Sequence, residues 1–259
     1  MIAEYTKGKK GIQSIEVGLK LIDALARMNG PKALGEIARA AGLSPSTTHR
    51  YMTSFIRTGM VNQDAATGRY DLGRMAVRVG LAALARIDAT SYAANAAREL
   101  VEETQLTVFS SVWGEQGPVI VSWIRGYNLV STSIGIGSRL PLIRSATGHI
   151  FRAFLPEALT AAVLEEEIET SYRGARSAAA RAELDKTVER VRRERFAMVK
   201  GKLIPGLRAA AAPILDCQGE VAVSLTMVGP DEPVIGRRTP AVLALKHKAQ
   251  EASRELGFD

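Results

Sequence analysis

The chain of 259 residues has little cysteine, little histidine and no long apolar run. Its single cysteine cannot form a disulfide bond within the chain, so nothing in the composition favours an oxidising compartment. No apolar run reaches the roughly 18 residues that span a bilayer, and the first ten residues lack the apolar stretch of a signal peptide. With 46% hydrophobic and 24% charged residues, the composition is that of a globular protein. We therefore expect a cytoplasmic protein that does not associate with a membrane.

Signals of catalysis or metal binding are also scarce. The three histidines, His49, His149 and His247, lie far apart, and no cysteine or carboxylate stands at metal-ligand spacing from them. A Gly-x-Ser-x-Gly nucleophile motif and a complete dinucleotide-binding glycine loop are both missing. We expect no metal, no cofactor and no catalytic residue. The acidic run at residues 165–167 is expected to be a solvated helix face.

Positive charge is concentrated in the first third of the chain. Residues 1–89 contain 13 Lys and Arg against 7 Asp and Glu, whereas residues 90–259 contain 21 against 20. A basic segment joined to a neutral one suits a module that meets a polyanion attached to a module that does not. Charge alone leaves open a basic surface that has no partner.

The N-terminal segment predicts three helices, because apolar residues recur at helical spacing in residues 12–26, 34–41 and 45–58. A short glycine-containing turn separates the second helix from the third. Ser44 suits the N-cap of the third helix, and Gly59 suits its C-terminal end. This arrangement is typical of a helix-turn-helix.

Two short strands, at residues 60–63 and 69–72, flank a glycine-containing turn and predict a β-hairpin after the helices. Together they make a winged helix-turn-helix. A further helical pattern begins at Arg74 and predicts a stiff connector. We place a DNA-binding domain at residues 1–73, a linker helix at residues 74–89 and a second domain at residues 90–259.

The third helix carries the residues expected to contact DNA. Ser46, Arg50, Thr53 and Arg57 recur at spacings of 4, 3 and 4, and so share a face opposite the apolar side. Hydroxyl and guanidinium groups suit phosphates and guanine edges in the major groove. The full set of expected contacts is Ser44, Ser46, Thr47, His49, Arg50, Thr53, Arg57 and Arg69, with Lys7, Lys9 and Lys10 as further phosphate contacts. A winged helix used only for protein contacts remains an alternative.

The second domain alternates strands with helices, which predicts an α+β fold with a mostly antiparallel sheet. Strands are expected near residues 108–113, 119–125, 130–134, 197–199, 207–215 and 221–228. Helices are expected near residues 92–103, 146–154, 156–169, 179–196 and 240–256. Trp113 and Trp123 fall on strands, where core packing is the default role and a pocket wall is the alternative.

Residues 34–38, 42–50 and 68–73 resemble the DNA-binding domain of the IclR family of bacterial transcription regulators. Residues 137–148, 205–214 and 228–230 resemble the second domain of that family. The resemblance covers almost the whole chain and has two independent blocks in the right order. It implies a GAF-like effector-binding domain behind the winged helix, and usually a dimer of dimers on DNA.

The resemblance also implies an effector site. Its expected residues are Ser145, Ala146, Thr147, Gly148, Val199, Ala209, Thr226 and Val228. The last four match positions where acid-sensing relatives carry an acidic residue, a cysteine and two serines. Ile143 and His149 stand where a histidine and a lysine are common. We therefore expect an effector larger and less polar than a small keto-acid, such as an aromatic or other organic acid or a carbonyl compound.

These observations predict a sequence-specific transcription regulator that binds a double-stranded DNA operator and a small-molecule effector. A homodimer or a dimer of dimers is expected, with Met75, Val79 and Ala83 of the linker helix as the pairing surface. Packing of these residues against their own domain is the alternative. An α+β enzyme that processes its ligand, with an appended winged helix, is the competing function.

Overall fold

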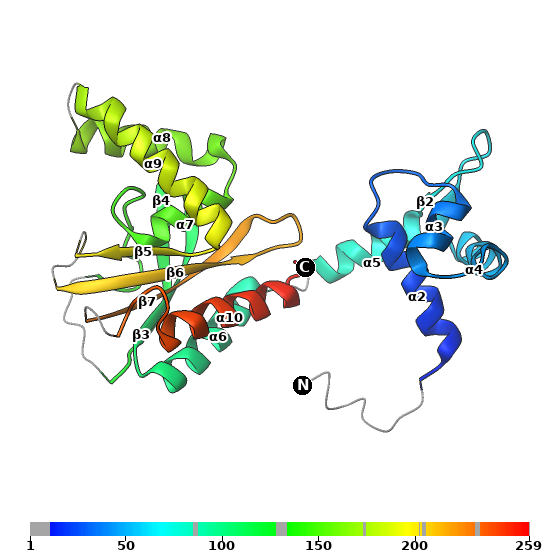
Figure 1. The fold of residues 1–259 in the computed structure, drawn as a ribbon, viewed down its shortest axis with the longest axis horizontal. Helices are drawn as coiled ribbons and strands as arrows, with labels where there is room; N and C mark the ends of the chain where they lie inside the picture. The colour runs from blue at the N-terminus through cyan, green and yellow to red at the C-terminus, as the bar shows by residue number, and fades with distance from the viewer. Residues whose placement is uncertain are drawn as a thin grey trace. The chain divides into compact units, whose positions relative to one another are not determined.

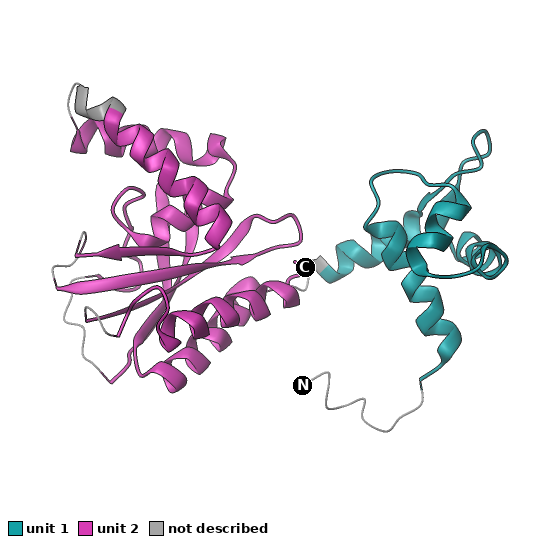
Figure 2. Cartoon of the chain, viewed as in Figure 1, with its two compact units in different colours: residues 1–87 teal, residues 88–259 magenta. Residues whose placement is uncertain are grey.

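A computed structural model describes residues 11–84, 88–127, 134–172, 175–201, 203, 206–230 and 234–258. The chain divides into two compact units, residues 1–87 and residues 88–259 (Figure 2). Lys7, Lys9 and Lys10 lie outside the described residues, as do residues 130–133 of one expected strand. None of the described helices is long and apolar enough to cross a membrane.

The first unit is a winged helix-turn-helix, as the sequence predicts (Figure 1). Its elements are α2 (Gln13–Ala26), α3 (Leu34–Ala41), α4 (Pro45–Thr58), β1 (Val61–Gln63), β2 (Tyr70–Leu72) and α5 (Arg74–Leu84). β1 and β2 pair in an antiparallel hairpin. Gly42 and Gly59 both adopt left-handed backbone conformations, with φ of 68° and 73°, and end α3 and α4.

The core of this unit forms where α2, α3 and α4 meet. Its buried residues are Leu21, Leu25, Ile37, Met52, Val61 and Tyr70. Ile12, Ile15 and Leu19, which helped to predict α2, are 56–65% exposed. The helix has two apolar sides, and its buried side contains Gly18, Leu21 and Leu25. The spacing therefore predicts the helix correctly but does not indicate which side packs inward.

The second unit is an α+β domain. Its elements are α6 (Ala89–Thr104), β3 (Thr107–Gly114), β4 (Gly117–Ile124), α7 (Ala146–Phe154), α8 (Glu157–Ser171), α9 (Ala175–Glu194), β5 (Ala197–Lys200), β6 (Leu207–Leu215), β7 (Val221–Pro230) and α10 (Pro240–Glu255). Ile134, the one described residue of the expected strand at 130–134, is not in a strand. The other expected strands and helices are present.

Five strands form one sheet in the order β4-β3-β7-β6-β5, and every neighbouring pair is antiparallel. α6 and α10 pack together against one face of the sheet, and α7 packs against the other (Figure 1). α9 packs on α7 and does not extend over the whole sheet. The sheet is therefore covered on both faces, which explains why β6 and β7 are almost continuously buried.

Candidate functional site

The recognition helix α4 is capped by its own sequence. Ser44 Oγ accepts a hydrogen bond from the backbone N–H of Thr47 at 3.2 Å, and Pro45 occupies the first helical position. The Ser44 hydroxyl also donates to Thr47 Oγ1 at 2.9 Å. These two expected DNA contacts therefore have a structural role at the start of the helix, although Ser44 remains exposed.

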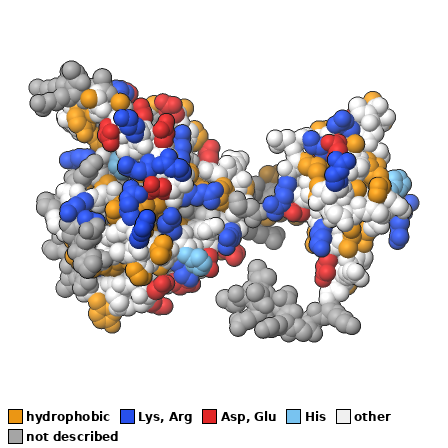
Figure 3. Space-filling model, viewed as in Figure 1, with side chains coloured by type: hydrophobic (Ala, Val, Ile, Leu, Met, Phe, Trp, Pro, Cys, Tyr) orange, Lys and Arg blue, Asp and Glu red, His pale blue; other side chains and the backbone are white. Residues whose placement is uncertain are grey.

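The expected DNA face of α4 is open to solvent. Ser46, His49, Arg50, Thr53 and Arg57 are all exposed, whereas Thr48 and Met52 on the opposite side are fully buried. Figure 3 shows Lys and Arg side chains and a histidine on the surface of this unit. The Thr53 hydroxyl donates to the carbonyl of His49 at 2.9 Å, so its oxygen faces the helix backbone. The two arginines keep their guanidinium groups available.

The hairpin adds a second basic position. Asp64 shapes its turn by accepting hydrogen bonds from the N–H groups of Ala66 and Thr67 and from the Thr67 hydroxyl, which lowers the pKa of Asp64. Arg69 is exposed, and its Nη1 donates to the carbonyl of Pro31 at 3.2 Å. This contact fixes Arg69 beside the turn that follows α2, while the rest of its guanidinium group faces solvent.

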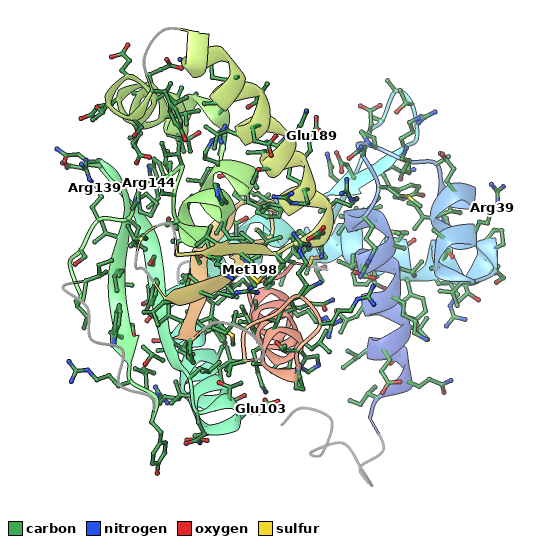
Figure 4. The ribbon with its side chains drawn as sticks, turned by 60° about the vertical axis from the view of Figure 1, so that its left-hand side comes forward. Arg39, Glu103, Arg139, Arg144, Glu189 and Met198 are labelled. Carbon is green, nitrogen blue, oxygen red and sulfur yellow. The ribbon has the colours of Figure 1, made fainter. Side chains whose placement is uncertain are left out.

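One basic residue near α4 was missed by the sequence interpretation. Arg39 lies in the last turn of α3, is exposed, and points away from the body of its unit (Figure 4). α3 and α4 pack together, as in other helix-turn-helix units. The helical period of α3, which buries Ile37 and Ala38, could have predicted the exposure of Arg39.

In the second unit, the sheet places the expected effector residues in two rows facing α7. Val199, Ala209 and Val228 are direct cross-strand neighbours on β5, β6 and β7. Thr226, two residues before Val228, pairs with Phe109 of β3. Since side chains alternate along a strand, the rows share one face of the sheet. All of these residues line one cavity.

The N-terminus of α7 closes this cavity. Ser145, Ala146 and Thr147 line it, and Thr147 Oγ1 lies 2.8 Å from Thr226 Oγ1 in a buried hydrogen bond. Ser145 Oγ accepts from the N–H of Gly148 at 2.8 Å and donates to the carbonyl of Pro141 at 2.6 Å. Ser145 therefore caps the helix in addition to lining the cavity.

The first two backbone N–H groups of α7, those of Ala146 and Thr147, have no hydrogen-bond partner among the described residues. Unpaired N–H groups at a helix start favour an anion. Gly148, also expected in the site, does not line the cavity. A Cβ at Gly148 would lie 2.4 Å from the Pro141 carbonyl oxygen, so glycine is needed there for close packing.

A stacked aromatic pair forms one wall of the cavity. The sequence left open whether Trp113 and Trp123 pack in the core or form such a wall. Trp123 stacks on Phe109 with ring centroids 5.1 Å apart and planes 6° from parallel, and both residues line the cavity. Trp113 instead packs against Phe151 in the core. The two tryptophans therefore have different roles, because their strands place them at different points along the sheet. The remaining lining residues are Ile134, Leu140, Gly201, Leu203, Leu207 and Arg208.

The cavity is small and mostly apolar, with a volume of about 40 Å³. Its polar lining consists of the hydroxyls of Ser145, Thr147 and Thr226. Arg208 borders it through β6, but its side chain alternates with that of Ala209 and so lies on the other face of the sheet. Arg208 Nη1 donates to the carbonyl of Ile235 at 3.2 Å. An apolar cavity with a few polar groups at one side is typical of a small-molecule site.

A carboxylate of α8 holds the loop that precedes α7 by hydrogen bonds. Glu167 accepts hydrogen bonds from the N–H groups of Leu142 and Ile143 at 2.8 and 3.1 Å. The prediction that residues 165–167 form a purely solvated face is therefore wrong for Glu167, which is half-buried. Glu165 is exposed but forms an ion pair with Arg181, which lowers the pKa of Glu165. Glu165 is paired because α9 packs on α8 and carries Arg181.

These two sites define a class of protein, a DNA-binding regulator whose second domain encloses a small-molecule cavity. Residues 14–65 match the IclR helix-turn-helix domain, and residues 81–254 match the bacterial transcriptional regulator IclR C-terminal domain. The chain belongs to the IclR family of bacterial transcription regulators. Its C-terminal domain is the effector-binding domain of that family.

Known relatives agree over nearly the full length. The crystal structure of HmgR from Pseudomonas aeruginosa has a TM-score of 0.79 at 35% identity, covering 96% of this chain and 99% of HmgR. The transcriptional repressor IclR of Escherichia coli K12 is 29% identical over 240 residues, covering 92% of this chain and 87% of the repressor. An IclR homologue from Microbacterium hydrocarbonoxydans complexed with 4-hydroxybenzoate shares the fold, at 18% identity, a TM-score of 0.54, and 94% and 99% coverage of the two chains.

Proposed function

We propose that this regulator binds a DNA operator through α4 and releases or retains it in response to an aromatic or other organic acid, or a related carbonyl compound. The observation that carries the proposal is the cavity beneath α7. It joins unpaired backbone N–H groups at one side to stacked aromatic rings at the other. The protein acts by binding its ligand and not by converting it.

Support for operator binding comes from the exposed face of α4. Ser46, Arg50 and Arg57 lie along a helix whose contact stripe is about 16 Å long, at a rise of about 1.5 Å per residue. Such a stripe fits within the major groove and reaches several successive base pairs. Arg39 and Arg69 supply positive charge on either side for phosphates.

Support for an acidic ligand comes from the polar side of the cavity. A carboxylate or carbonyl oxygen there accepts from the N–H groups of Ala146 and Thr147. Thr147 and Thr226 hydrogen-bond each other, so one of their two hydroxyls, the one that accepts, adds a further donor. Among the described lining residues there is no histidine or carboxylate to serve as a general base, which supports binding without catalysis.

Support for an aromatic body comes from the opposite wall. Phe109 and Trp123 present stacked rings, and an aromatic ligand placed beside them continues the stack. Val199, Ala209 and Val228 replace polar residues that would bind a small keto-acid, as the family resemblance implies. The 4-hydroxybenzoate complex of the Microbacterium homologue is a precedent for an aromatic acid on this fold.

The ligand must also enlarge its cavity. A cavity of about 40 Å³ holds a few water molecules, whereas a benzene ring occupies an apolar cavity of about 150 Å³. Binding therefore displaces lining residues, and the N-terminus of α7 is the lining element that also carries the ligand's donors. A ligand that favours the enlarged state shifts the population of conformations, which is the physical requirement for an effector.

We further propose that the protein binds DNA as a dimer or a dimer of dimers. Helix α5 leaves Val77, Val79 and Leu81 at 51–61% exposure, and α2 leaves Ile15 and Leu19 exposed in the same unit. Of the predicted pairing residues, Val79 and Ala83 are exposed and Met75 is half-buried. Exposed apolar residues on these helices favour burial against a second copy. Light scattering at micromolar concentration tests this assembly, and a strict monomer on an asymmetric operator contradicts it.

A gel shift with DNA flanking the protein's own gene tests the operator proposal. A specific shift that scrambled DNA does not compete supports sequence-specific binding. Failure to retard this DNA beyond scrambled DNA contradicts it for that operator and favours a winged helix with protein partners. The same assay with candidate effectors added shows whether binding is strengthened or weakened.

Calorimetry with a panel of acids tests the effector proposal. Benzoate and 4-hydroxybenzoate are expected to bind more tightly than pyruvate or glyoxylate. Ala146→Leu fills the cavity and is expected to abolish binding of the aromatic acids while leaving operator affinity nearly unchanged, because α4 belongs to the other unit. Tight glyoxylate binding with no binding of any aromatic acid contradicts the proposal, as does an Ala146→Leu protein that responds normally.

A further inference from the structure

A second cavity lies on the other side of α7. Thr147 lines the effector cavity and His149 lines the second one, and two residues on a helix are about 200° apart. The second cavity is bounded by α9 and by β5, both of which pack against α7. Figure 4 locates these elements by Glu189 on α9 and Met198 on β5.

The volume of the second cavity sets it apart from the effector cavity. It measures about 480 Å³, against about 40 Å³ beneath the N-terminus of α7. Small-molecule sites occupy roughly 300–1,000 Å³. The second cavity therefore accepts a ring-sized ligand in the conformation that the structure shows, without displacement of its walls.

Its inner surface is apolar and buried. Ile143, Leu184, Val191 and Phe196 are each at most 8% exposed and line it together. The buried His149 lies among them as a polar group of α7. This surface suits a ligand with an aromatic or branched aliphatic body.

The rim carries charged side chains of both signs. Arg190 and Thr187 lie one turn apart on α9, and Arg190 Nη2 is 3.5 Å from Thr187 Oγ1. Arg237 faces the rim from the segment before α10 and is paired with Glu194 at 2.6 Å. Among the described residues that line the cavity, Glu183 is the one carboxylate. Arg190 is therefore the cation best placed to receive an anionic group.

We propose that this second cavity binds an organic anion with an apolar body, whose carboxylate is received by Arg190. The class of ligand follows from the position of the donors at the mouth and of Phe196 and its neighbours inside. The site is separate from the effector cavity of the proposed function, and its existence does not depend on that function.

The two cavities are mechanically connected. Val199 of β5 lines both of them, and α7 lies between them. Ile143 lines the second cavity from the loop that Glu167 holds in front of α7. A ligand in the second cavity therefore changes the affinity of the effector cavity, and thermodynamic linkage requires the reverse effect to be equal. This coupling, unlike the site itself, rests on the proposed function.

Calorimetry on Ala146→Leu protein tests the site in isolation, because leucine fills the effector cavity. The probe is 1-naphthoate, and neutral 1-naphthalenemethanol is its uncharged control. We expect one naphthoate per chain and weaker binding of the alcohol. Adding Arg190→Gln is expected to weaken naphthoate about tenfold. Lys186→Gln, the same loss of charge on an exposed position of α9 outside the cavity, is the matched control and is expected to have no effect.

A filling substitution provides an independent readout. Ala180→Trp, on the α9 wall, is expected to abolish naphthoate binding in the Ala146→Leu background. The proposal is overturned if the Ala146→Leu protein does not bind naphthoate. It is also overturned if neither Arg190→Gln nor Ala180→Trp, each added to that protein, weakens naphthoate binding. Wild-type protein that binds one naphthoate, lost with Ala180→Trp and kept with Ala146→Leu, supports the second cavity whatever the benzoate panel shows for the effector cavity. The two failures are therefore distinguishable.

Discussion

Gly148 determines how closely α7 approaches the loop before it, and Gly148→Ala tests that dependence. The added Cβ would lie 2.4 Å from the Pro141 carbonyl oxygen and 2.5 Å from the Leu142 Cα. Both are backbone atoms, and Glu167 holds the N–H of Leu142, so neither can rotate away. Non-bonded carbon contacts are favourable near about 3.5 Å, so α7 and the loop must separate by about 1 Å.

Two opposing terms set the size of the effect. Glycine to alanine inside an unconstrained helix stabilises a protein by about 0.5–1 kcal/mol. Overpacking a rigid site costs about 1–3 kcal/mol. We expect the second term to win and the free energy of unfolding of residues 88–259 to fall by about 1–2 kcal/mol. The shift also separates Thr147 Oγ1 from Thr226 Oγ1, so effector binding should weaken about tenfold.

Urea unfolding followed by tryptophan fluorescence measures this change, because both tryptophans lie in residues 88–259. Gly35→Ala in α3 is the control, since a Cβ at Gly35 meets nothing within 4 Å. Its unfolding, followed by circular dichroism, should show a small gain in stability. A Gly148→Ala protein that is as stable as wild type and binds its effector normally would refute the reasoning.

Three further outcomes follow from single residues. Arg50→Ala should weaken operator binding by about 1–3 kcal/mol and flatten the preference at one base pair; a gel shift with an unchanged ratio of operator to scrambled DNA would argue against base reading. Thr48→Val should raise the free energy of unfolding of residues 1–87 by about 1 kcal/mol. Thr48 is fully buried and its hydroxyl has no partner among the described residues, so removing the hydroxyl removes an unsatisfied buried group. A lower midpoint in a circular dichroism melt would contradict this prediction. The hydroxyls of Ser91 and Thr90, with their N–H groups, lower the pKa of Asp88 to about 2. The stabilisation that the Asp88 carboxylate gives α6 is therefore complete above the ordinary pKa of an aspartate and is lost as pH falls through about 2. Asp88→Ala should therefore lower the melting temperature much more at pH 7 than at pH 2, and an equal effect at both values would exclude the charged cap.

Much of the fold could be predicted because its signals are local. Ser44, Pro45 and Gly59 define the ends of α4 through capping and backbone conformation, which depend on neighbouring residues alone. The antiparallel strands were predictable from alternating segments bounded by turns. The burial of Thr48 and Met52 and the exposure of Arg50 follow from the period of the helix.

What could not be predicted depends on contacts between distant segments. Phe109 and Trp123 both line the cavity because the register of β3 against β4 pairs them. That register depends on both strands and cannot be predicted from the sequence of either one alone. Glu167 resembles its acidic neighbours in sequence and differs only by the loop it meets. The side of α2 that packs inward was not predictable for the same reason, since both of its sides are apolar.

The row formed by Val199, Ala209 and Val228 bears on how such a sensor acquires a new signal. Each side chain faces the cavity from a strand whose backbone is fixed by hydrogen bonds to its neighbours. A change of side chain in this row alters the shape and polarity of the cavity while the sheet keeps its pairing. Helix α4, which is proposed to read the operator, belongs to the other compact unit and is unchanged by such substitutions. Laboratory selection for biosensors can therefore randomise these three codons together and retain the promoter that reports the result.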